Sequence, residues 1–342
     1  MIGMGGTERC LHMDDKLKEK FYEGKSREEI TELFFDMFYA ALSRRVWLTC
    51  GEEGRTWLAA ALTAFGRDRG KELAALFEKN GLEKTVPELV RCFDFIIRGV
   101  YRLREEEEQG RFQLVVEDSP RLENMKKYGK DECIELYIRT VFPALAAAFS
   151  PEIRVTGAQI SLAEGQIRLH IEGPGASGGA FSGRSLDRGK EYAAAVKDLY
   201  DTMYGFIAAE VMEKAGAEGE QIVRRGIRDF GMFRGRRLRM MHEEEGLERN
   251  LFNLMDYYDI PSVEGYHEDK EVFTPVQDIC NVETCNHFQR WRDKGMLRYG
   301  VMYCEEVHNA FWTAYNENIV VWQPEILTRG DGRCRFVTKI EE

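Results

Sequence analysis

The sequence predicts an α+β protein built from two tandem repeats, each with helices first and a small antiparallel sheet last. Three observations lead to this prediction. Short motifs recur at one spacing along the 342 residues, apolar side chains recur at helical spacing early in each repeat, and strand-like segments close each repeat. Two long units imply two similar domains packed as a pseudo-dimer, because a solenoid needs shorter units repeated at least three times.

Recurring motifs give the evidence for the duplication. A Gly-x-Glu-Gly motif at 51–54 recurs at 216–219, an offset of 165 residues. The same offset relates Phe-Gly-x-x-Arg-Gly at 65–70 to 230–235 and Gly-Leu-Glu at 81–83 to 246–248. Farther along, we expect the offset to drift to 171, which pairs Tyr128, Gly129 and Cys133 with Tyr299, Gly300 and Cys304.

Composition places the boundary between the repeats. A Gly/Ser-rich run, Gly173 to Gly183, is typical of a flexible linker. A phosphate-binding loop is the competing interpretation, but the run lacks the Gly-Lys-Ser/Thr ending of such loops. We therefore predict a degenerate, scaffold-like first repeat over 16–172, a linker over 173–186 and a second repeat over 187–342.

Periodicity predicts the elements of each repeat. Along the second helix of the second repeat, apolar residues and Arg234 fall on one stripe at helical spacing. An alternating pattern then predicts a closing hairpin, 319–327 and 333–340, around a Gly-Asp-Gly turn at 330–332. The predicted helices are 27–45, 55–79, 187–215, 220–245 and 301–316.

Charge and cysteine content exclude several classes of partner. A net charge of −11 argues against nucleic acid, whose phosphates require clustered Lys and Arg. The longest nearly apolar run, 141–149, is too short to span a membrane, and the first residues lack the apolar region of a signal peptide. Eight cysteines without a secretory signal indicate reduced thiols and a cytoplasmic location. We expect a small-molecule substrate, and a homo-oligomer is compatible with the sequence.

A thiol and an imidazole on the last long helix mark the candidate site. Cys304 and His308 are four residues apart and so share a helix face, where a nearby imidazole can lower the pKa of a thiol. Glu305 is a candidate proton carrier beside them. Three other features of this region are Cys285, His287 and Cys334, which lies just after the Gly-Asp-Gly turn.

The first repeat is expected to lack this arrangement. At the offset of 171, His308 is matched by Tyr137 and Glu305 by Ile134. Cys285 is matched by Ser119, Cys334 by Ile167 and Asp331, loosely, by Glu164. The bland interpretations are a buried structural cysteine, a core histidine at 308 and an interhelical ion-pair role for Arg234.

The closing motifs resemble a known family. They are Tyr303-Cys304-Glu305-Glu306, Ala310, Asn316, Gly330-Asp331 and Cys334-Arg335-Phe336. Together with Cys285 and the Phe-Gly-x-x-Arg-Gly motif, they resemble the L-2-amino-thiazoline-4-carboxylic acid hydrolase family over 191–340 and, more weakly, over 30–171. The Gly-Asp-x-x-Cys-x-Phe motif is also similar to the 4-vinyl-reductase domain, in which cysteines can hold zinc.

The resemblance implies a hydrolase that opens a small cyclic amidine or amide bearing a carboxylate, without a cofactor. Cys304 as a thiolate would attack the sp² carbon, with His308 activating it and Glu305, if its pKa is near neutrality, moving protons. Substrate binding would fall to Arg234, as a fork on the carboxylate, with Tyr315 and Asp331. The alternative is a small-molecule-binding or sensory module in which Cys285, Cys304 and Cys334, with His308 or His287, hold zinc.

Overall fold

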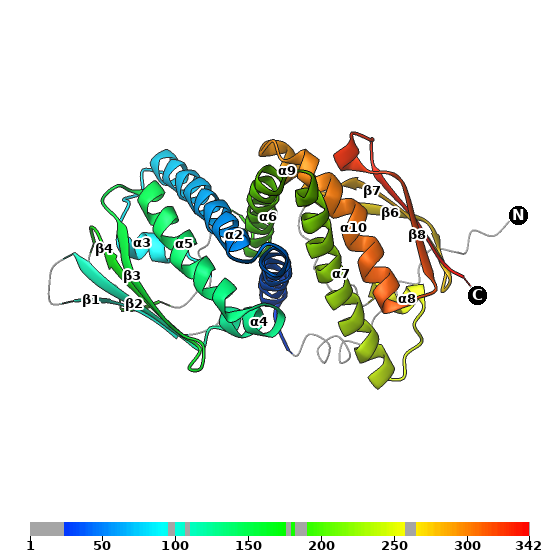
Figure 1. Cartoon of the computed structure of the whole chain (residues 1–342), viewed down its shortest axis with the longest axis horizontal. Coiled ribbons are helices and arrows are strands. Elements are labelled where there is room, and N and C mark those ends of the chain that lie inside the picture. The colour runs from blue at the N-terminus through cyan, green and yellow to red at the C-terminus, as the bar shows by residue number, and fades with distance from the viewer. Residues whose placement is uncertain are drawn as a thin grey trace, which may run out of the picture.

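A computed structural model describes residues 24–94, 100–106, 110–175, 179–181, 190–256 and 265–341. Two sheets lie at opposite ends of the molecule and the long helices lie between them (Figure 1). Each half has helices packed on a small antiparallel sheet, which confirms the predicted α+β class and the two repeats. Within the ranges given above, none of the helices combines the length and apolar character that a membrane span requires.

The first repeat contains a five-stranded sheet in the order β3-β4-β2-β1-β5, with every pair antiparallel. Its last strand, β5, comes from within the predicted linker, of which residues 176–178 and 182–186 lie outside the described part. Its elements are α2 (Arg27–Lys79), α3 (Val86–Val90), β1 (Val100–Glu105), β2 (Arg111–Glu117), α4 (Pro120–Tyr128), α5 (Asp131–Phe149), β3 (Arg154–Ser161), β4 (Gln166–Glu172) and β5 (Gly179–Phe181).

The second repeat contains a four-stranded sheet in the order β6-β7-β9-β8, which is the order β1-β2-β4-β3 of the first repeat. The closing hairpin β8–β9 was predicted, whereas the hairpin β6–β7 that completes the sheet was not. Its elements are α6 (Tyr192–Ala215), η1 (Gly216–Glu218), α7 (Gly219–Glu244), α8 (Leu251–Asp256), β6 (His267–Phe273), β7 (Gln277–Thr284), α9 (Asn286–Asp293), α10 (Leu297–Tyr315), β8 (Ile319–Glu325), η2 (Leu327–Arg329) and β9 (Cys334–Ile340).

One glycine in each repeat produces the same bend between the first two helices. Gly51 has φ 57° and ψ −134°, and Gly216 has φ 56° and ψ −126°. Side chains larger than hydrogen are strained at such a positive φ. The bend divides α2 into two arms that correspond to α6 and α7. The recurring Gly-x-Glu-Gly motif therefore encodes a repeated change of chain direction.

A second pair of glycines fixes how the helices cross in each repeat. A Cβ atom at Gly66 would lie 2.5 Å from the carbonyl oxygen of Val141 on α5. A Cβ atom at Gly231 would lie 2.7 Å from the carbonyl oxygen of Val307 on α10. Because only glycine permits this approach, the two crossings are equivalent, and Val141 corresponds to Val307.

This crossing corrects the predicted correspondence between α5 and α10. The offset is 166 rather than 171, and a hydrogen bond repeats at that spacing: the Tyr39 hydroxyl donates to the Cys133 carbonyl (2.7 Å), and the Tyr204 hydroxyl to the Tyr299 carbonyl (2.6 Å). The predicted matches of Cys133 with Cys304, Tyr137 with His308 and Ile134 with Glu305 were wrong. The counterparts of Cys304, Glu305 and His308 are Ile138, Arg139 and Phe142.

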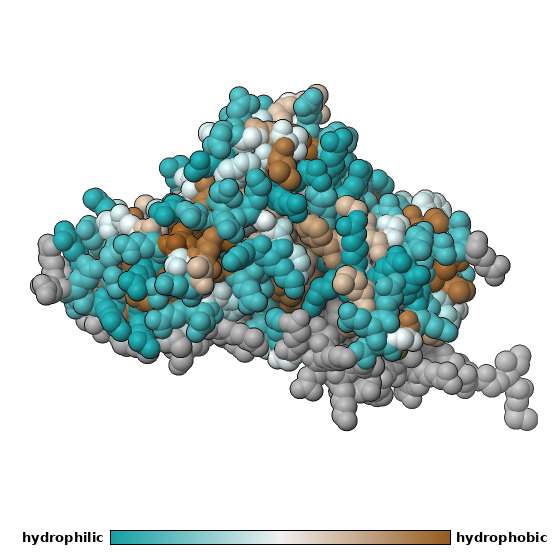
Figure 2. Space-filling model, turned by 60° about the horizontal axis from the view of Figure 1, so that its bottom comes forward, coloured by the Kyte–Doolittle hydropathy of each residue, from teal (hydrophilic) through white to brown (hydrophobic). Residues whose placement is uncertain are grey.

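The repeats pack through their first helices, α2 against α6 and α7, and one apolar cluster runs through both. Phe38 of α2 stacks on Tyr200 of α6 at 4.5 Å between ring centroids. The Tyr192 hydroxyl donates to the Glu32 carboxyl across the same interface (2.6 Å). The face shown in Figure 2 is largely hydrophilic, with small separate apolar patches.

Candidate functional site

Three cysteines of the second repeat gather where α10, the start of α9 and the start of β9 meet. Cys304 is half-buried on α10 and packs against both apolar clusters of the molecule. Burial raises the pKa of its thiol well above the ordinary value, and the neighbouring Cys334 and Cys285 raise it further. The expected thiolate at Cys304 is therefore not the resting form, because a thiol with a raised pKa stays protonated at neutral pH.

The same thiols were the predicted zinc ligands. Burial raises the pKa of Cys285, and that of Cys334 to about 11, so all three would have to lose protons to bind metal. Among the residues that the structure describes, no group of three or more His, Cys, Asp and Glu side chains is arranged to hold a metal ion. Zinc stays a prediction for metal analysis to test.

His308 lies one helical turn from Cys304, as predicted. Its ring contacts Trp312 and Phe336, with centroid distances of 5.3 and 4.9 Å. Burial lowers the pKa of His308 to about 3, and the positive charge of Arg234 contributes. The ring is therefore neutral at pH 7 and cannot supply the imidazolium that would stabilise a thiolate.

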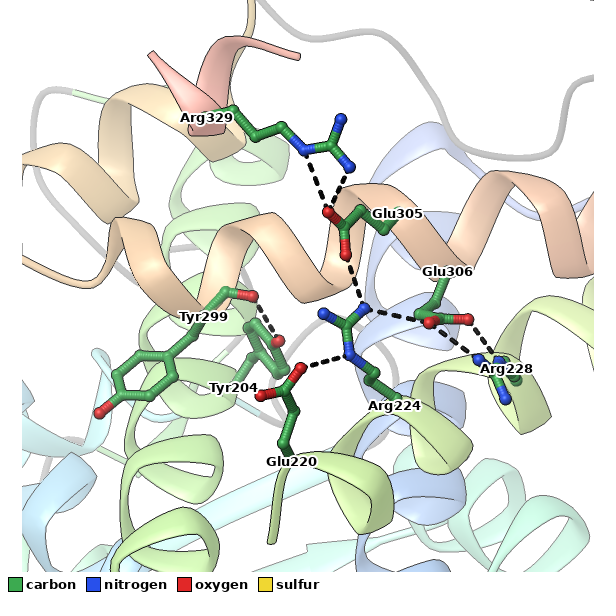
Figure 3. A network of polar contacts seen from close by, with 8 residues as sticks. All are labelled: Tyr204, Glu220, Arg224, Arg228, Tyr299, Glu305, Glu306 and Arg329. Atoms are coloured by element: carbon green, nitrogen blue, oxygen red, sulfur yellow. Dashed lines mark hydrogen bonds and ion pairs between the residues drawn. The ribbon is translucent and has the colours of Figure 1, made fainter. Parts of the chain in front are cut away.

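Glu305 belongs to an ion-pair network that joins α7, α10 and η2 (Figure 3). It accepts from Arg224 at 2.7 Å and from the Arg329 Nε at 3.0 Å. Burial raises the pKa of Glu305, but the hydrogen bonds from Arg329 and Arg224 outweigh this effect and leave it lowered. The near-neutral pKa that a proton carrier requires is thus contradicted. Instead, Glu305 holds η2 against α10.

Arg224 is the centre of this network. It also pairs with Glu220 at 2.7 Å and with Glu306 at 3.1 Å, and Arg228 pairs with Glu306 from the next turn of α7. The Tyr204 hydroxyl bond to the Tyr299 carbonyl ties α6 to the same stretch of α10 (Figure 3). These contacts fix the rotation of α10 and hence the direction in which Cys304 faces.

Two predicted substrate contacts have structural partners. The Tyr315 hydroxyl hydrogen-bonds to the His242 Nδ1 at 2.7 Å inside the core. The Asp331 Oδ2 accepts from the Ile326 backbone N–H at 2.7 Å and so closes the turn before β9. These bonds account for both side chains without a substrate.

Arg234 is buried, with 1% of its surface exposed. Its guanidinium lies 4.3 Å from the centroid of the Phe311 ring and 5.4 Å from that of Phe34, which comes from the first repeat. Such contacts stabilise a buried cation. Arg234 therefore contributes positive potential from behind the site, and a fork on a substrate carboxylate would require a path into the core.

The sequence analysis missed two functional candidates on α6, Asp201 and Lys197, and Asp201 contacts His287. The His287 Nδ1 hydrogen-bonds to the Asp201 Oδ1 at 2.6 Å. Lys197 lies one turn earlier on α6 and is half-buried. Burial lowers its pKa to about 8, with Arg27 and Arg234 lowering it and Asp201 and Cys285 raising it. At pH 7 its ammonium form still predominates.

The sequence repeat could have revealed Asp201 and Lys197. At the offset of 165, Asp201 corresponds to Asp36, and Lys197 corresponds to Glu32. Because a buried Asp recurs at the same place on the first helix of each repeat, extending the offset towards the N-terminus would have found it.

The equivalent place in the first repeat is closed by its own ion pairs. Arg121, the counterpart of His287, pairs with Asp36 and, at 3.0 Å, with Asp94. Asp94 also pairs with Arg69, the counterpart of Arg234, at 3.3 Å and accepts from the Tyr137 hydroxyl. All these side chains are buried. The equivalent position of the first repeat is therefore occupied by oppositely charged side chains that pair with each other. In the second repeat the same position holds Lys197, His287 and the thiols.

Comparison with known proteins identifies the family of both repeats. The family model of L-2-amino-thiazoline-4-carboxylic acid hydrolase matches twice, over residues 27–166 and 192–337. No curated protein and no solved structure matches the chain significantly. The two matches cover most of the chain and confirm both the resemblance and the duplication, whereas the similarity to 4-vinyl-reductase domains stays a prediction. The chain belongs to the L-2-amino-thiazoline-4-carboxylic acid hydrolase family.

Proposed function

We propose that the second repeat hydrolyses a small cyclic amidine that carries a carboxylate, with Cys304 as the nucleophile. One observation carries the proposal: the two repeats place different side chains around a shared Asp and Arg. Where the first repeat has Glu32 and Arg121, the second has Lys197 and His287. The first repeat therefore has a buried ion-pair cluster where the second has a half-buried lysine, an imidazole and neighbouring thiols.

Lys197 is the proposed partner of the substrate carboxylate. Lys197 is a half-buried residue, whereas Arg234 is buried and adds positive potential. Burial strengthens an ion pair between Lys197 and an anion because water screens it less. The pKa of about 8 also rises when an anion binds, since a negative charge favours the ammonium form.

Ring opening requires a nucleophile at the amidine carbon. The Cys304 Sγ forms a bond to this carbon, the bond from the carbon to a ring heteroatom breaks, and the thiol proton ends on that heteroatom. Water then adds to the same carbon while the carbon–sulfur bond breaks, and one water proton returns to the thiol. The net change is the addition of one water molecule, so the step needs neither oxidant nor cofactor.

Activity on L-2-amino-thiazoline-4-carboxylate tests the proposal. We expect Cys304→Ala to lower kcat/KM at least ~1,000-fold, while Cys133→Ala, also a thiol on a long helix, retains nearly full activity. Lys197→Ala should lower kcat/KM by about 10-fold or more for this substrate and much less for 2-amino-thiazoline without the carboxylate. Product formation is followed by mass spectrometry. Equal activity of Cys304→Ala and Cys133→Ala would overturn the assignment.

Metal analysis of the same preparation separates the zinc alternative. If purified protein contains about one zinc per chain, and a chelator removes the zinc and exposes Cys304 to alkylation, the thiol is a ligand and the binding-module interpretation replaces the nucleophile. Metal-free protein that hydrolyses the substrate supports the thiol mechanism.

A further inference from the structure

We propose that His287, oriented by Asp201, takes the proton from the Cys304 thiol in the second repeat, and that His308 serves only as a packed ring beside it. This inference rests on the proposed hydrolysis and names its proton-transfer group. Two imidazoles, His287 and His308, belong to the region of the thiols, and their surroundings differ.

His287 is held in one orientation by contacts on several sides. Its ring stacks on Trp291, with centroids 5.6 Å apart and an interplanar angle of 22°, and contacts Tyr200 and Tyr303 at 5.8 and 5.7 Å. Its Nδ1 is bound to Asp201. Since the side chain keeps 19% of its surface exposed, the ring is oriented but not sealed from a substrate.

Asp201 determines which ring nitrogen carries the proton. A carboxylate accepts hydrogen bonds, so Nδ1 donates and the lone pair resides on Nε2. Asp201 lies inside the core, and its Oδ2 has no hydrogen-bond partner in the part of the chain that the structure describes. A buried carboxylate whose main partner is a histidine supplies a counter-charge when Nε2 takes a proton.

His287 is close to the thiols along the chain and through a ring contact with the residue before Cys304. It lies two residues after Cys285 and contacts Tyr303, the residue before Cys304. The charge on Asp201 raises the pKa of the Cys285 and Cys304 thiols, and His287 lowers the pKa of His308. The Asp–His pair therefore belongs to the same cluster as the nucleophile.

His308 has a different environment. Trp312 and Phe336 lie against its ring, and Phe142 occupies the equivalent position in the first repeat. A phenylalanine at the matching site shows that this position of the helix accepts an aromatic packing residue. The lowered pKa of His308, about 3, agrees with a packing role, since such a ring is a weak base.

The proton route then balances. As the Cys304 Sγ bonds to the amidine carbon, the thiol proton passes to the His287 Nε2, and from there to the departing ring heteroatom. In the second half, Nε2 takes a proton from the attacking water and returns it to the Cys304 sulfur. The first repeat cannot do this, because Arg121 stands in place of His287 and a guanidinium does not give up its proton.

Five variants test the inference: His287→Asn, His287→Gly, His308→Asn, Asp201→Asn and, as an exposed control, His267→Asn. We expect His287→Asn to lower kcat for L-2-amino-thiazoline-4-carboxylate about 100-fold or more with little change in KM, because general acid–base catalysis contributes factors of 10²–10⁴. His308→Asn and His267→Asn should stay within about threefold. Asp201→Asn, which keeps the side-chain shape, should lower kcat and alter its pH profile. Added imidazole should partly restore His287→Gly, which a purely structural role would not allow.

A second readout does not depend on hydrolysis. Iodoacetamide forms a bond to the Cys304 sulfur only as the thiol proton leaves, so His287→Asn should slow labelling of Cys304 about fivefold or more at pH 7 while His308→Asn does not. If wild-type protein fails to hydrolyse the substrate but shows this labelling pattern, the proposed reaction fails and the proton-transfer pair stands. Equal labelling in His287→Asn and wild type, or a loss of kcat in His308→Asn as large as in His287→Asn, would overturn the inference.

Discussion

The two repeats share the order of four strands and the crossing of their helices, but they fill the same buried position with different side chains. In the first repeat, Arg121 is enclosed by Asp36 and Asp94, and every side chain of the cluster is buried. In the second, the corresponding His287 pairs with Asp201 and keeps 19% of its side chain exposed. The glycines that bend and cross the helices are identical in both. At this position the repeats therefore differ in the polar side chains that the shared helix packing brings together.

The comparison predicts that the buried cluster of the first repeat stabilises the fold, whereas the equivalent residues of the second repeat take part in catalysis. Arg121→Ala is the substitution with the largest expected effect. Removing this guanidinium leaves Asp36 and Asp94 buried without their main partner, which should destabilise the protein by about 3–5 kcal/mol. Urea unfolding measures the change. The exposed pair of Arg139 with Glu135 provides the control, and Arg139→Ala should cost less than about 1 kcal/mol. A small effect of Arg121→Ala would show that the cluster is not the structural element of the first repeat.

The pH dependence of stability sharpens the same contrast. Burial raises the pKa of Glu32 to about 8, although Arg121 and Tyr192 oppose the shift, and burial raises that of Asp36 to about 6. Because these folded-state values exceed the unfolded ones, the stability that these two carboxyl groups contribute is fully present below about pH 4 and is lost as the pH rises towards 8. Glu32→Gln should remove most of the decline between pH 6 and 8.

Thermal or urea unfolding from pH 5 to 9 measures this effect. At pH 9, Glu32→Gln should be more stable than wild type by on the order of a few kcal/mol, and at pH 5 the two should nearly coincide. The exposed Glu132→Gln variant is the control and should follow the wild-type curve. A Glu32→Gln curve parallel to wild type would mean that Glu32 is ionised without cost.

The smallest effect tests whether the two scaffolds are equivalent. Gly51→Ala and Gly216→Ala place a side chain at nearly the same positive φ, with open space around both, so each should cost about 1–2 kcal/mol. Gly332→Ala, which also meets no neighbouring atom, is the control and should be nearly neutral. If the two substitutions lower the free energy of unfolding by amounts that differ by more than about 1 kcal/mol, the two bends are not equivalent.

Much of the architecture could be predicted because it is encoded in local patterns. Helical periodicity located the arms of α2, α6 and α7, and alternation located the hairpin β8–β9. The spacing of Cys304 and His308 placed both on α10 correctly. The predicted roles required a lowered pKa for the Cys304 thiol and a basic imidazole at His308. Burial instead raises the pKa of Cys304 and lowers that of His308. Local spacing states which groups are near each other, but it does not state how far each one is removed from water.

The sequence by itself determined the duplication, the glycines that bend and cross the helices, and the family. These follow from motifs that recur at a fixed offset and from a residue type that alone tolerates the required backbone. Only the tertiary structure decided that α10 aligns with α5 at 166 rather than 171, and that Asp201 meets His287 where Asp36 meets Arg121. The physical reason is that helix crossing sets which faces meet, and partners distant in sequence then set the charge of each buried group.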